Sequence, residues 1–158
     1  MSWDLDRTDF EILSLLRRDG RMPVRDVADE VSLAPSTVHD RIAALRESGA
    51  LKGIHAEVEE RSIGVGLQAL IAVRLKKHSR DLVEDFRSHA LRRSPVVSLY
   101  HVGGEHDFLI HVAVRDADQL RDFVLDQFTT RPEIEHVETW IVFEYAPTWE
   151  LPDVTRIA

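Results

Sequence analysis

The residues whose functional groups are best suited to bind a ligand or to react lie together in the segment GGEHD, residues 103–107. Gly103 and Gly104 expose backbone N–H groups that no side chain obstructs, and Glu105 or Asp107 can accept a hydrogen bond from an ammonium group. This turn therefore combines N–H groups that could bind an anion with a carboxylate that could bind a cation. The same residues also satisfy a tight hairpin without any ligand, with Asp107 as its cap. No nucleophile or phosphate-binding loop accompanies the two carboxylates, so acid–base catalysis is disfavoured.

Three histidines surround this turn: His106 lies within it, and His101 and His111 lie on the flanking segments. A metal site needs ligands that converge at about 2 Å from one ion. Alternation along two strands would send these side chains to both faces of a sheet, so we expect no metal site. The chain has no cysteine, which removes thiolate zinc sites, disulfides and cysteine nucleophiles. The lack of cysteine fits a cytoplasmic protein. No catalytic constellation or cofactor motif stands out, so the first expectation is a protein that is not an enzyme and needs no cofactor.

A second group of polar residues occupies one face of the segment 35–48. Val38, Ile42 and Leu45 recur at i, i+4 and i+7, which predicts a helix with one apolar stripe. Pro35 suits its first turn, and Gly49 suits a left-handed stop. Short or polar groups able to reach base edges or phosphates stand on the other face: Ser36, Thr37, His39, Asp40 and Arg41.

A helical pattern through Val27, Ala28 and Val31 precedes this segment across a very short break. The two patterns predict a helix-turn-helix, with residues 35–48 as the recognition helix and with Pro35 at its DNA-facing end. An ordinary helical hairpin whose polar face meets water is the alternative, and Arg41 could then pair with Asp40 or Glu47.

The net charge of −8 opposes nonspecific binding to nucleic acid by the chain as a whole. DNA binding would therefore need local basic patches, and the basic residues expected near the duplex are Arg21, Arg25, Arg41, Arg46 and Lys52. No apolar run reaches the length of a membrane span, and the acidic start does not resemble a signal peptide.

Changes of hydrophobic period divide the chain into an α+β arrangement. A first helix, with Asp6 as N-cap and a stop at Gly20, completes a three-helix unit over residues 1–52. Residues 53–59 alternate as a half-buried strand, and residues 53–66 form a strand and hinge linker. A strand, helix, strand, strand, helix and strand then follow at 67–75, 80–92, 96–102, 108–114, 116–128 and 137–145. This βαββαβ order predicts a ferredoxin-like domain over residues 67–146, followed by a tail at 147–158. We expect a second subunit to cover the open face of its sheet.

These features together resemble the feast/famine (Lrp/AsnC) regulators over roughly residues 4–146. The segments that carry the resemblance are LDRTDFEIL, LAPSTVHDRIAALRESGALKG, VGGEHDFLI and TWIVFEY. The resemblance implies a winged helix-turn-helix that binds a palindromic site on double-stranded DNA. It also implies dimers formed through the C-terminal domains, often assembled to an octamer, with an amino-acid effector bound between dimers. The effector-response positions of the family map onto Asp107 and the turn around it, and onto Ala117, Trp140, Ile141 and Val142.

The chain departs from the family pattern at some positions. Ala34 replaces the usual Ser or Thr cap of the recognition helix, and Ser32 replaces the usual Gly between the helices, where a left-handed backbone is expected to be mildly strained. The sirohaem decarboxylases resemble this family in both domains, so an enzyme on this scaffold is the alternative function. The complete recognition-helix pattern and the small GGEHD turn favour regulation.

Overall fold

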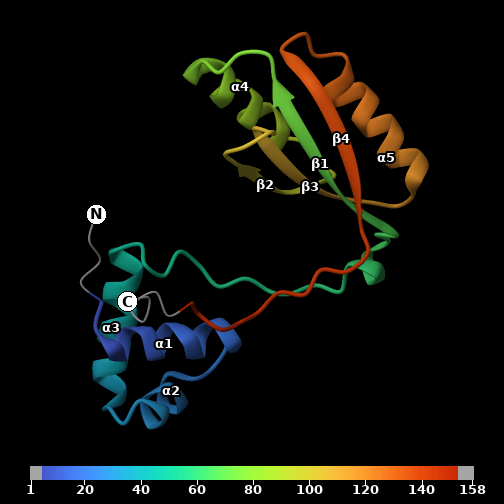
Figure 1. Cartoon of the computed structure of the whole chain (residues 1–158). Coiled ribbons are helices and arrows are strands. Elements are labelled where there is room, and N and C mark those ends of the chain that lie inside the picture. Colours follow the sequence, from blue (N-terminus) through green and yellow to red (C-terminus); the bar gives the residue numbers. More distant parts are fainter. Residues whose placement is uncertain (1–4, 153–158) are drawn as a thin grey trace. The chain divides into compact units, whose positions relative to one another are not determined.

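The computed structural model describes residues 5–152, which form two compact units (Figure 1). The first unit contains residues up to Glu57 together with the segment that begins at Ala146, and the second is Val58–Tyr145. No helix of the described residues is long and apolar enough to cross a membrane.

The first unit contains three helices: α1 (Arg7–Arg18), α2 (Val24–Glu30) and α3 (Pro35–Glu47). Their apolar stripes form one core of residues with at most 8% exposure, namely Ile12, Leu16, Val27, Ala28, Val38, Ile42 and Leu45. Asp6 caps α1 in a reciprocal capping box, in which Asp6 accepts from the Asp9 N–H and Asp9 accepts from the Asp6 N–H. The predicted three-helix unit is confirmed, with Asp6 as its first cap.

The turn between α2 and α3 has a left-handed backbone at Ser32, where φ is +55°. Gly49 has φ +79° directly after α3, which is the predicted stop. Ser32 thus adopts the expected left-handed conformation. This conformation is energetically unfavourable for an L-residue that has a Cβ atom.

The strand predicted at residues 53–59 is wrong for the isolated chain. No strand occurs among residues 5–57, so the described part of this unit is a helix-turn-helix without a paired wing. A strand requires a neighbour for its backbone groups, and the described chain provides none for this segment. Its alternating residues Ile54 and Val58 remain 43% and 53% exposed.

The second unit is the predicted α+β, ferredoxin-like domain. It opens with a 3₁₀ turn, η1 (Glu60–Ile63), and a left-handed Gly64. The elements that follow are β1 (Leu67–Leu75), α4 (Arg80–Leu91), β2 (Val96–His101), β3 (Phe108–Val114), α5 (Ala117–Val124), the π-helical turn η2 (Leu125–Thr129) and β4 (Ile134–Val142). The sheet order is β2-β3-β1-β4, and all neighbours are antiparallel.

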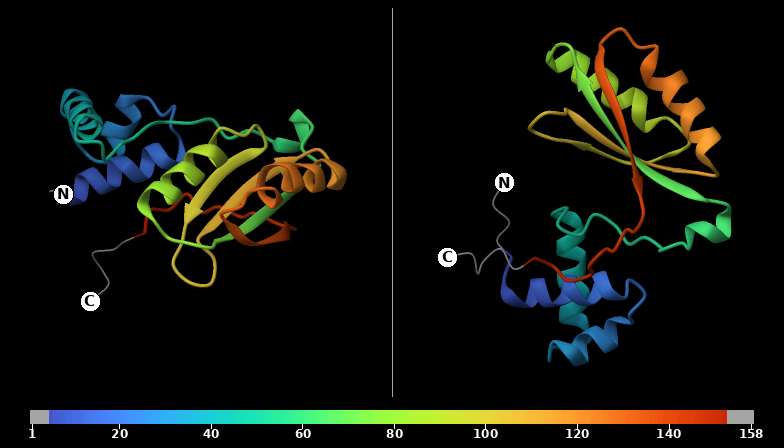
Figure 2. Two further views of the ribbon diagram at one scale, coloured as in Figure 1. Left: turned by 90° about the horizontal axis from the view of Figure 1, so that it is seen from above. Right: turned by 45° about the vertical axis from the view of Figure 1, so that its right-hand side comes forward.

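Both helices of this domain cover the same face of its sheet (Figure 2). Phe86 of α4 and Phe128 of η2 are fully buried against Ile71, Phe108 and Ile110 of the strands. The rings of Phe86 and Phe108 lie 4.7 Å apart. The other face therefore holds the side chains that point away from this core.

The final strand begins and ends three residues earlier than the sequence predicted. Ile134, only 8% exposed, pairs with Leu75, and Val142 pairs with Gln68 near the start of β1. Beyond Val142 the partner strand has almost ended, so the apolar alternation continues without pairing, and Phe143 is 97% exposed. Alternation alone could not locate this limit, because the length of the neighbouring strand sets it.

Candidate functional site

The first candidate site is the exposed face of α3. Ser36, Thr37, His39 and Asp40 are exposed, while Val38 and Ile42 on the opposite side are buried. His39 Nδ1 lies 3.5 Å from an Asp40 carboxylate oxygen, on the surface of the helix. This arrangement leaves the predicted polar groups free to meet a ligand surface.

The start of α3 lacks a side-chain cap. Ala34 at the N-cap has extended angles, φ −68° and ψ 142°, but its methyl group accepts no hydrogen bond. Pro35 at the first helical position has no N–H to satisfy. The N–H groups of Ser36 and Thr37 therefore remain available at the positive end of the helix dipole.

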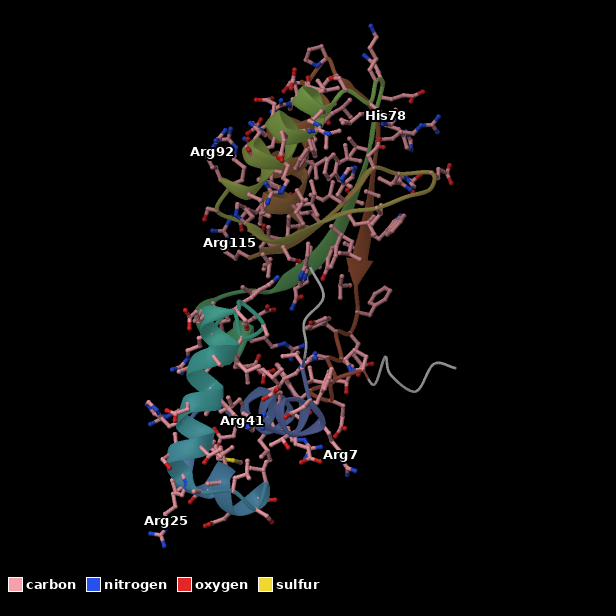
Figure 3. The ribbon with its side chains drawn as sticks, turned by 90° about the vertical axis from the view of Figure 1, so that its left-hand side faces the viewer. Arg7, Arg25, Arg41, His78, Arg92 and Arg115 are labelled. Carbon is pink, nitrogen blue, oxygen red and sulfur yellow. The ribbon has the colours of Figure 1, made fainter. Side chains whose placement is uncertain are left out.

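Basic residues near α3 fall into two groups. Arg25 and Lys52 are exposed, and Arg25 extends away from the helices (Figure 3). Arg41 instead lies between α3 and α1, where Nη1 donates to Asp6 and to Asp9 at 2.8 Å each. Its partners are therefore not Asp40 or Glu47.

Charges in this cluster stabilise one another. Hydrogen bonds from the Asp9 backbone and then from Arg41 lower the pKa of Asp6 below its ordinary value. Hydrogen bonds to Asp9 and then to Asp6 raise the pKa of Arg41 above its ordinary value. The contact therefore favours the charged forms of Arg41 and Asp6.

The second candidate site is the turn between β2 and β3. Gly103 and Gly104 have open space where a Cβ would stand, and Gly104 has φ +133°. Glu105 beside them is exposed, and it forms no ion pair with any residue between 5 and 152. The turn thus has open space at both glycines, next to a carboxylate without an ion pair among the described residues.

Asp107 has a different position from Glu105. Its Oδ2 accepts from the Leu75 N–H at 2.7 Å, and its Oδ1 lies 3.1 Å from His78 Nδ1. The Asp107 N–H also donates to the Val73 carbonyl at 2.9 Å. With its side chain only 14% exposed, Asp107 fastens the turn to the end of β1. This is the cap that the sequence left open as an alternative.

His106, within the turn, lies next to β4. Its side chain is 13% exposed, and its ring meets the Trp140 ring edge-on at 5.6 Å. Glu138 lies beside both, accepting from Trp140 Nε1 at 3.1 Å and approaching His136 at the same distance. Hydrogen bonds from His136 and then from Trp140 lower the pKa of Glu138. The predicted residues His106 and Trp140 are therefore brought together around a carboxylate.

The remaining predicted effector positions lie elsewhere in one protomer. Ile141 pairs with Ala69, toward the start of β1, and Ala117 begins α5 after the far end of β3. The turn adjoins the first residue of β3, whose seven residues span about 20 Å. One protomer thus separates Ala117 from the turn along the length of the sheet.

No group of three or more potential metal ligands converges anywhere in residues 5–152. His101 stacks on Phe108 at 4.8 Å, and His111 Nε2 lies 2.7 Å from Gln68 Oε1. The three histidines near the turn have separate partners, in keeping with strand alternation.

Two residues that the sequence analysis did not single out belong to this site. His78 follows β1 and reaches Asp107 from a distant part of the chain, so no local spacing indicates it. Glu138 lies two residues from both His136 and Trp140, and this period of two along one strand face could have identified it.

Comparison with known proteins identifies both domains. The profile of a winged helix-turn-helix DNA-binding domain matches residues 5–52, and that of the Lrp/AsnC ligand binding domain matches residues 68–146. The chain belongs to the Lrp/AsnC family. It is 36% identical over 142 residues to the HTH-type transcriptional regulator AldR of Mycolicibacterium smegmatis, covering 90% of this chain and 83% of AldR.

Further similar proteins agree with this assignment. The HTH-type transcriptional regulator FL11 of Pyrococcus horikoshii is 32% identical over 151 residues, which are 94% of this chain and 96% of FL11. A transcriptional regulator of Neisseria meningitidis, solved in complex with L-Met, has a TM-score of 0.85 and 30% identity over 94% of this chain and 96% of its own. This Lrp/AsnC chain is thus a helix-turn-helix regulator with a DNA-binding and a ligand-binding domain.

Proposed function

We propose that this Lrp/AsnC protein is a sequence-specific transcriptional regulator that reads a palindromic operator through α3 and responds to an amino acid. The observation that carries the DNA-binding part is the exposed polar face of α3, set on a fully buried apolar stripe. Ser36, Thr37 and His39 supply groups that can hydrogen-bond base edges, and Arg25 and Lys52 supply phosphate contacts.

The proposed reading unit is a homodimer, because a palindrome requires two copies of α3. The open sheet face supports this assembly: Leu70 is in register with both His111 and Trp140, and Tyr100 is 54% exposed. An apolar face of this kind is typical of a surface that a second copy covers. Residues 53–59 alternate in hydrophobicity but have no partner strand in the described chain, so they supply a second pairing element. Closed assembly of dimers to an octamer rests on the family resemblance.

The proposed effector site is centred on the GGEHD turn. The N–H groups of Gly103 and Gly104 would bind the carboxylate of an amino acid, and Glu105 would bind its ammonium group. Asp107 and His106 would hold the turn and one wall of the pocket, and Trp140 would limit the side chain that fits. The Neisseria meningitidis relative in complex with L-Met supports this class of ligand.

Ala117 and Ile141 take part in this proposal through the assembly. Because both lie away from the turn in one protomer, they would contribute from a neighbouring subunit. The effector site would then be complete only between dimers, which would couple ligand binding to oligomeric state.

In vitro selection tests the DNA-binding function directly. The full chain is incubated with a random-sequence DNA library, and the bound duplexes are amplified and sequenced. A palindromic consensus with high affinity relative to a scrambled duplex of equal length supports the proposal. Enrichment of no sequence after repeated rounds would reject it.

Calorimetry tests the effector function. The twenty amino acids are screened by thermal shift, since a ligand that binds only the folded state raises stability. The best ligand is then titrated into the wild type and into Glu105→Gln. Loss of heat in Glu105→Gln, with an unchanged melting temperature, supports the proposed ammonium partner, while undiminished affinity would contradict it.

A further inference from the structure

The strongest observation not used by the proposed function is the contact between the recognition helix and the start of α1. One nitrogen of Arg41, Nη1, makes two hydrogen bonds of 2.8 Å, one to Oδ2 of Asp6 and one to Oδ1 of Asp9. Asp6 and Asp9 are also the two halves of the capping box of α1. A single side chain of α3 therefore contacts both acidic residues that begin another helix.

The Arg41–Asp9 half of this contact is more protected than the other ion pairs among the described residues of the same unit, while Asp6 is 52% exposed. The Arg41 side chain is 32% exposed and that of Asp9 is 14%, whereas Arg7 and Glu11 on the outer face of α1 are 93% and 46% exposed. An ion pair with limited access to water is screened less than a surface pair. Loss of Arg41 would leave the Asp9 carboxylate partly buried without its cationic partner.

A direct contact between Arg41 and DNA would disrupt this arrangement. The guanidinium would have to leave both carboxylates, and these would then stand uncompensated near the phosphates of the duplex. Arg25 and Arg46 are exposed and form no ion pair with any residue from 5 to 152, so they can meet phosphates without such a rearrangement. Arg25 and Arg46 are therefore available to contact DNA, whereas Arg41 is already bound to two carboxylates of the same unit.

The contact also adds what the apolar core lacks, which is directional restraint. Ile12, Ile42 and Leu45 pack α1 against α3, but apolar packing is non-directional and leaves small rotations and shifts inexpensive. Two hydrogen bonds from one fixed nitrogen to the first turn of α1 restrict how α3 can rotate about its own axis. Reading of base edges depends on that rotation, whereas contacts to phosphates tolerate it.

We propose that Arg41 is a positioning residue: it sets the orientation of the recognition helix by binding the Asp6–Asp9 capping box, and it does not contact DNA itself. This inference rests on the proposed function, since it assumes that α3 reads an operator. It replaces the expectation from the sequence that Arg41 lies at the DNA surface.

The sign of the effect at Asp9 separates this role from its alternatives. If Arg41 contacted DNA and the carboxylates merely competed for it, Asp9→Asn would release it and raise operator affinity. If Arg41 positions α3, Asp9→Asn lowers operator affinity even though it removes a negative charge. The conservative Arg41→Lys also differs between the roles. The lysine ammonium can replace the single arginine nitrogen that bridges the two carboxylates. It is a poor substitute for a guanidinium that makes two hydrogen bonds to a DNA base.

The experiment measures binding of the full-length protein to two labelled duplexes by fluorescence anisotropy, at several salt concentrations. One duplex is the consensus obtained by in vitro selection, and the other is a scrambled sequence of equal length and composition. The variants are Arg41→Ala, Arg41→Lys, Asp9→Asn and the double variant Arg41→Ala/Asp9→Asn. Matched controls remove the same charges from the same helices without this contact: Arg46→Ala on α3 and Glu11→Gln on α1. All are measured at a temperature where circular dichroism shows each variant folded.

Positioning predicts that Arg41→Ala and Asp9→Asn each lower consensus affinity about tenfold, which equals about 1.4 kcal/mol. The affinity of each variant for the scrambled duplex stays within about twofold of the wild type. The double variant binds the consensus no more weakly than Arg41→Ala, because both substitutions remove the same contact. Arg41→Lys restores most of the affinity. The salt slope is unchanged for Arg41→Ala but falls by about one for Arg46→Ala, which loses a phosphate contact.

A fall of the salt slope in Arg41→Ala, or a gain in consensus affinity in Asp9→Asn beyond that of Glu11→Gln, would overturn the inference. Additive losses in the double variant would also overturn it. Selection that yields no consensus at all is a failure of the proposed function and is recorded before any variant is tested. The two failures are therefore distinguishable.

Discussion

A serine at position 34 should stabilise the recognition helix. The backbone of Ala34 already has the extended angles of an N-cap, and no side chain in residues 5–152 accepts the free N–H groups of the first turn. In Ala34→Ser the new hydroxyl can accept from the Thr37 N–H without any change of backbone. Capping by Ser in place of Ala is worth about 1 kcal/mol, so the population of the opened helix should fall about fivefold.

Native-state hydrogen exchange is the appropriate measurement, because it reports the opening of α3 by itself. The amides of α3 should exchange about fivefold more slowly in Ala34→Ser than in the wild type, as follows from a gain of about 1 kcal/mol. Ala43→Ser is the matched control, since it makes the same chemical change at an exposed interior position of α3. There serine lowers helix propensity, so exchange should accelerate.

A charged cap at position 34 separates stability from DNA binding. Ala34→Asp should protect α3 at least as well as serine, because its carboxylate also interacts favourably with the helix dipole. It places that charge at the proposed DNA-facing end, so operator binding should weaken while it is preserved in Ala34→Ser. Unchanged exchange in Ala34→Ser, or equal protection in Ala43→Ser, would refute the inference that the cap is missing.

Three further predictions concern other parts of the chain. Ser32→Gly should raise the free energy of unfolding by about 0.5 kcal/mol, because the strain relieved at a left-handed backbone exceeds the entropy cost of glycine. Denaturation in urea measures this free energy, and a loss of stability would contradict the strain. Gly66→Ala should destabilise the protein by about 1–3 kcal/mol, because the new Cβ would clash with the Arg115 carbonyl oxygen. Gly103→Ala is the control, since open space surrounds its Cβ position and its stability should not change. Equal melting temperatures of the two variants would refute the clash. His89 should make the wild type lose stability as pH falls below about 6.5: burial lowers its pKa in the folded state, so the unfolded state takes up the proton first. His89→Leu should flatten this dependence below pH 6.5. If the melting temperatures of wild type and variant change with pH in the same way, His89 does not contribute.

The sequence predicted the element order well because hydrophobic periodicity is a local property. The strands β1 and β3 have the predicted limits, and α4 begins at the predicted residue. The limits of β4 were displaced because they depend on the length of β1. The predicted strand at residues 53–59 is unpaired because pairing is a property of two segments, and alternation describes only one.

The candidate site was predicted in composition and only partly in contacts. The turn glycines and the position of Asp6 follow from local rules of caps and hairpins. The partners of Arg41 and Asp107 lie 29 to 35 residues away in the sequence, so only the tertiary fold reveals that both are held. A charged residue on a predicted surface cannot be classed as free or held until its distant neighbours are known.

The C-terminal segment also changes how the first unit can be isolated. Residues 146–152 belong to that unit, and Arg17 Nη2 donates to the Thr148 carbonyl while Arg18 pairs with Glu150 at 2.7 Å. In the sequence, the ferredoxin-like domain therefore lies between two segments of the first unit. A fragment that stops at residue 57 loses part of its own domain. Joining residue 57 to residue 146 through a flexible linker would retain it, so the segment to excise is the middle of the gene and not its end.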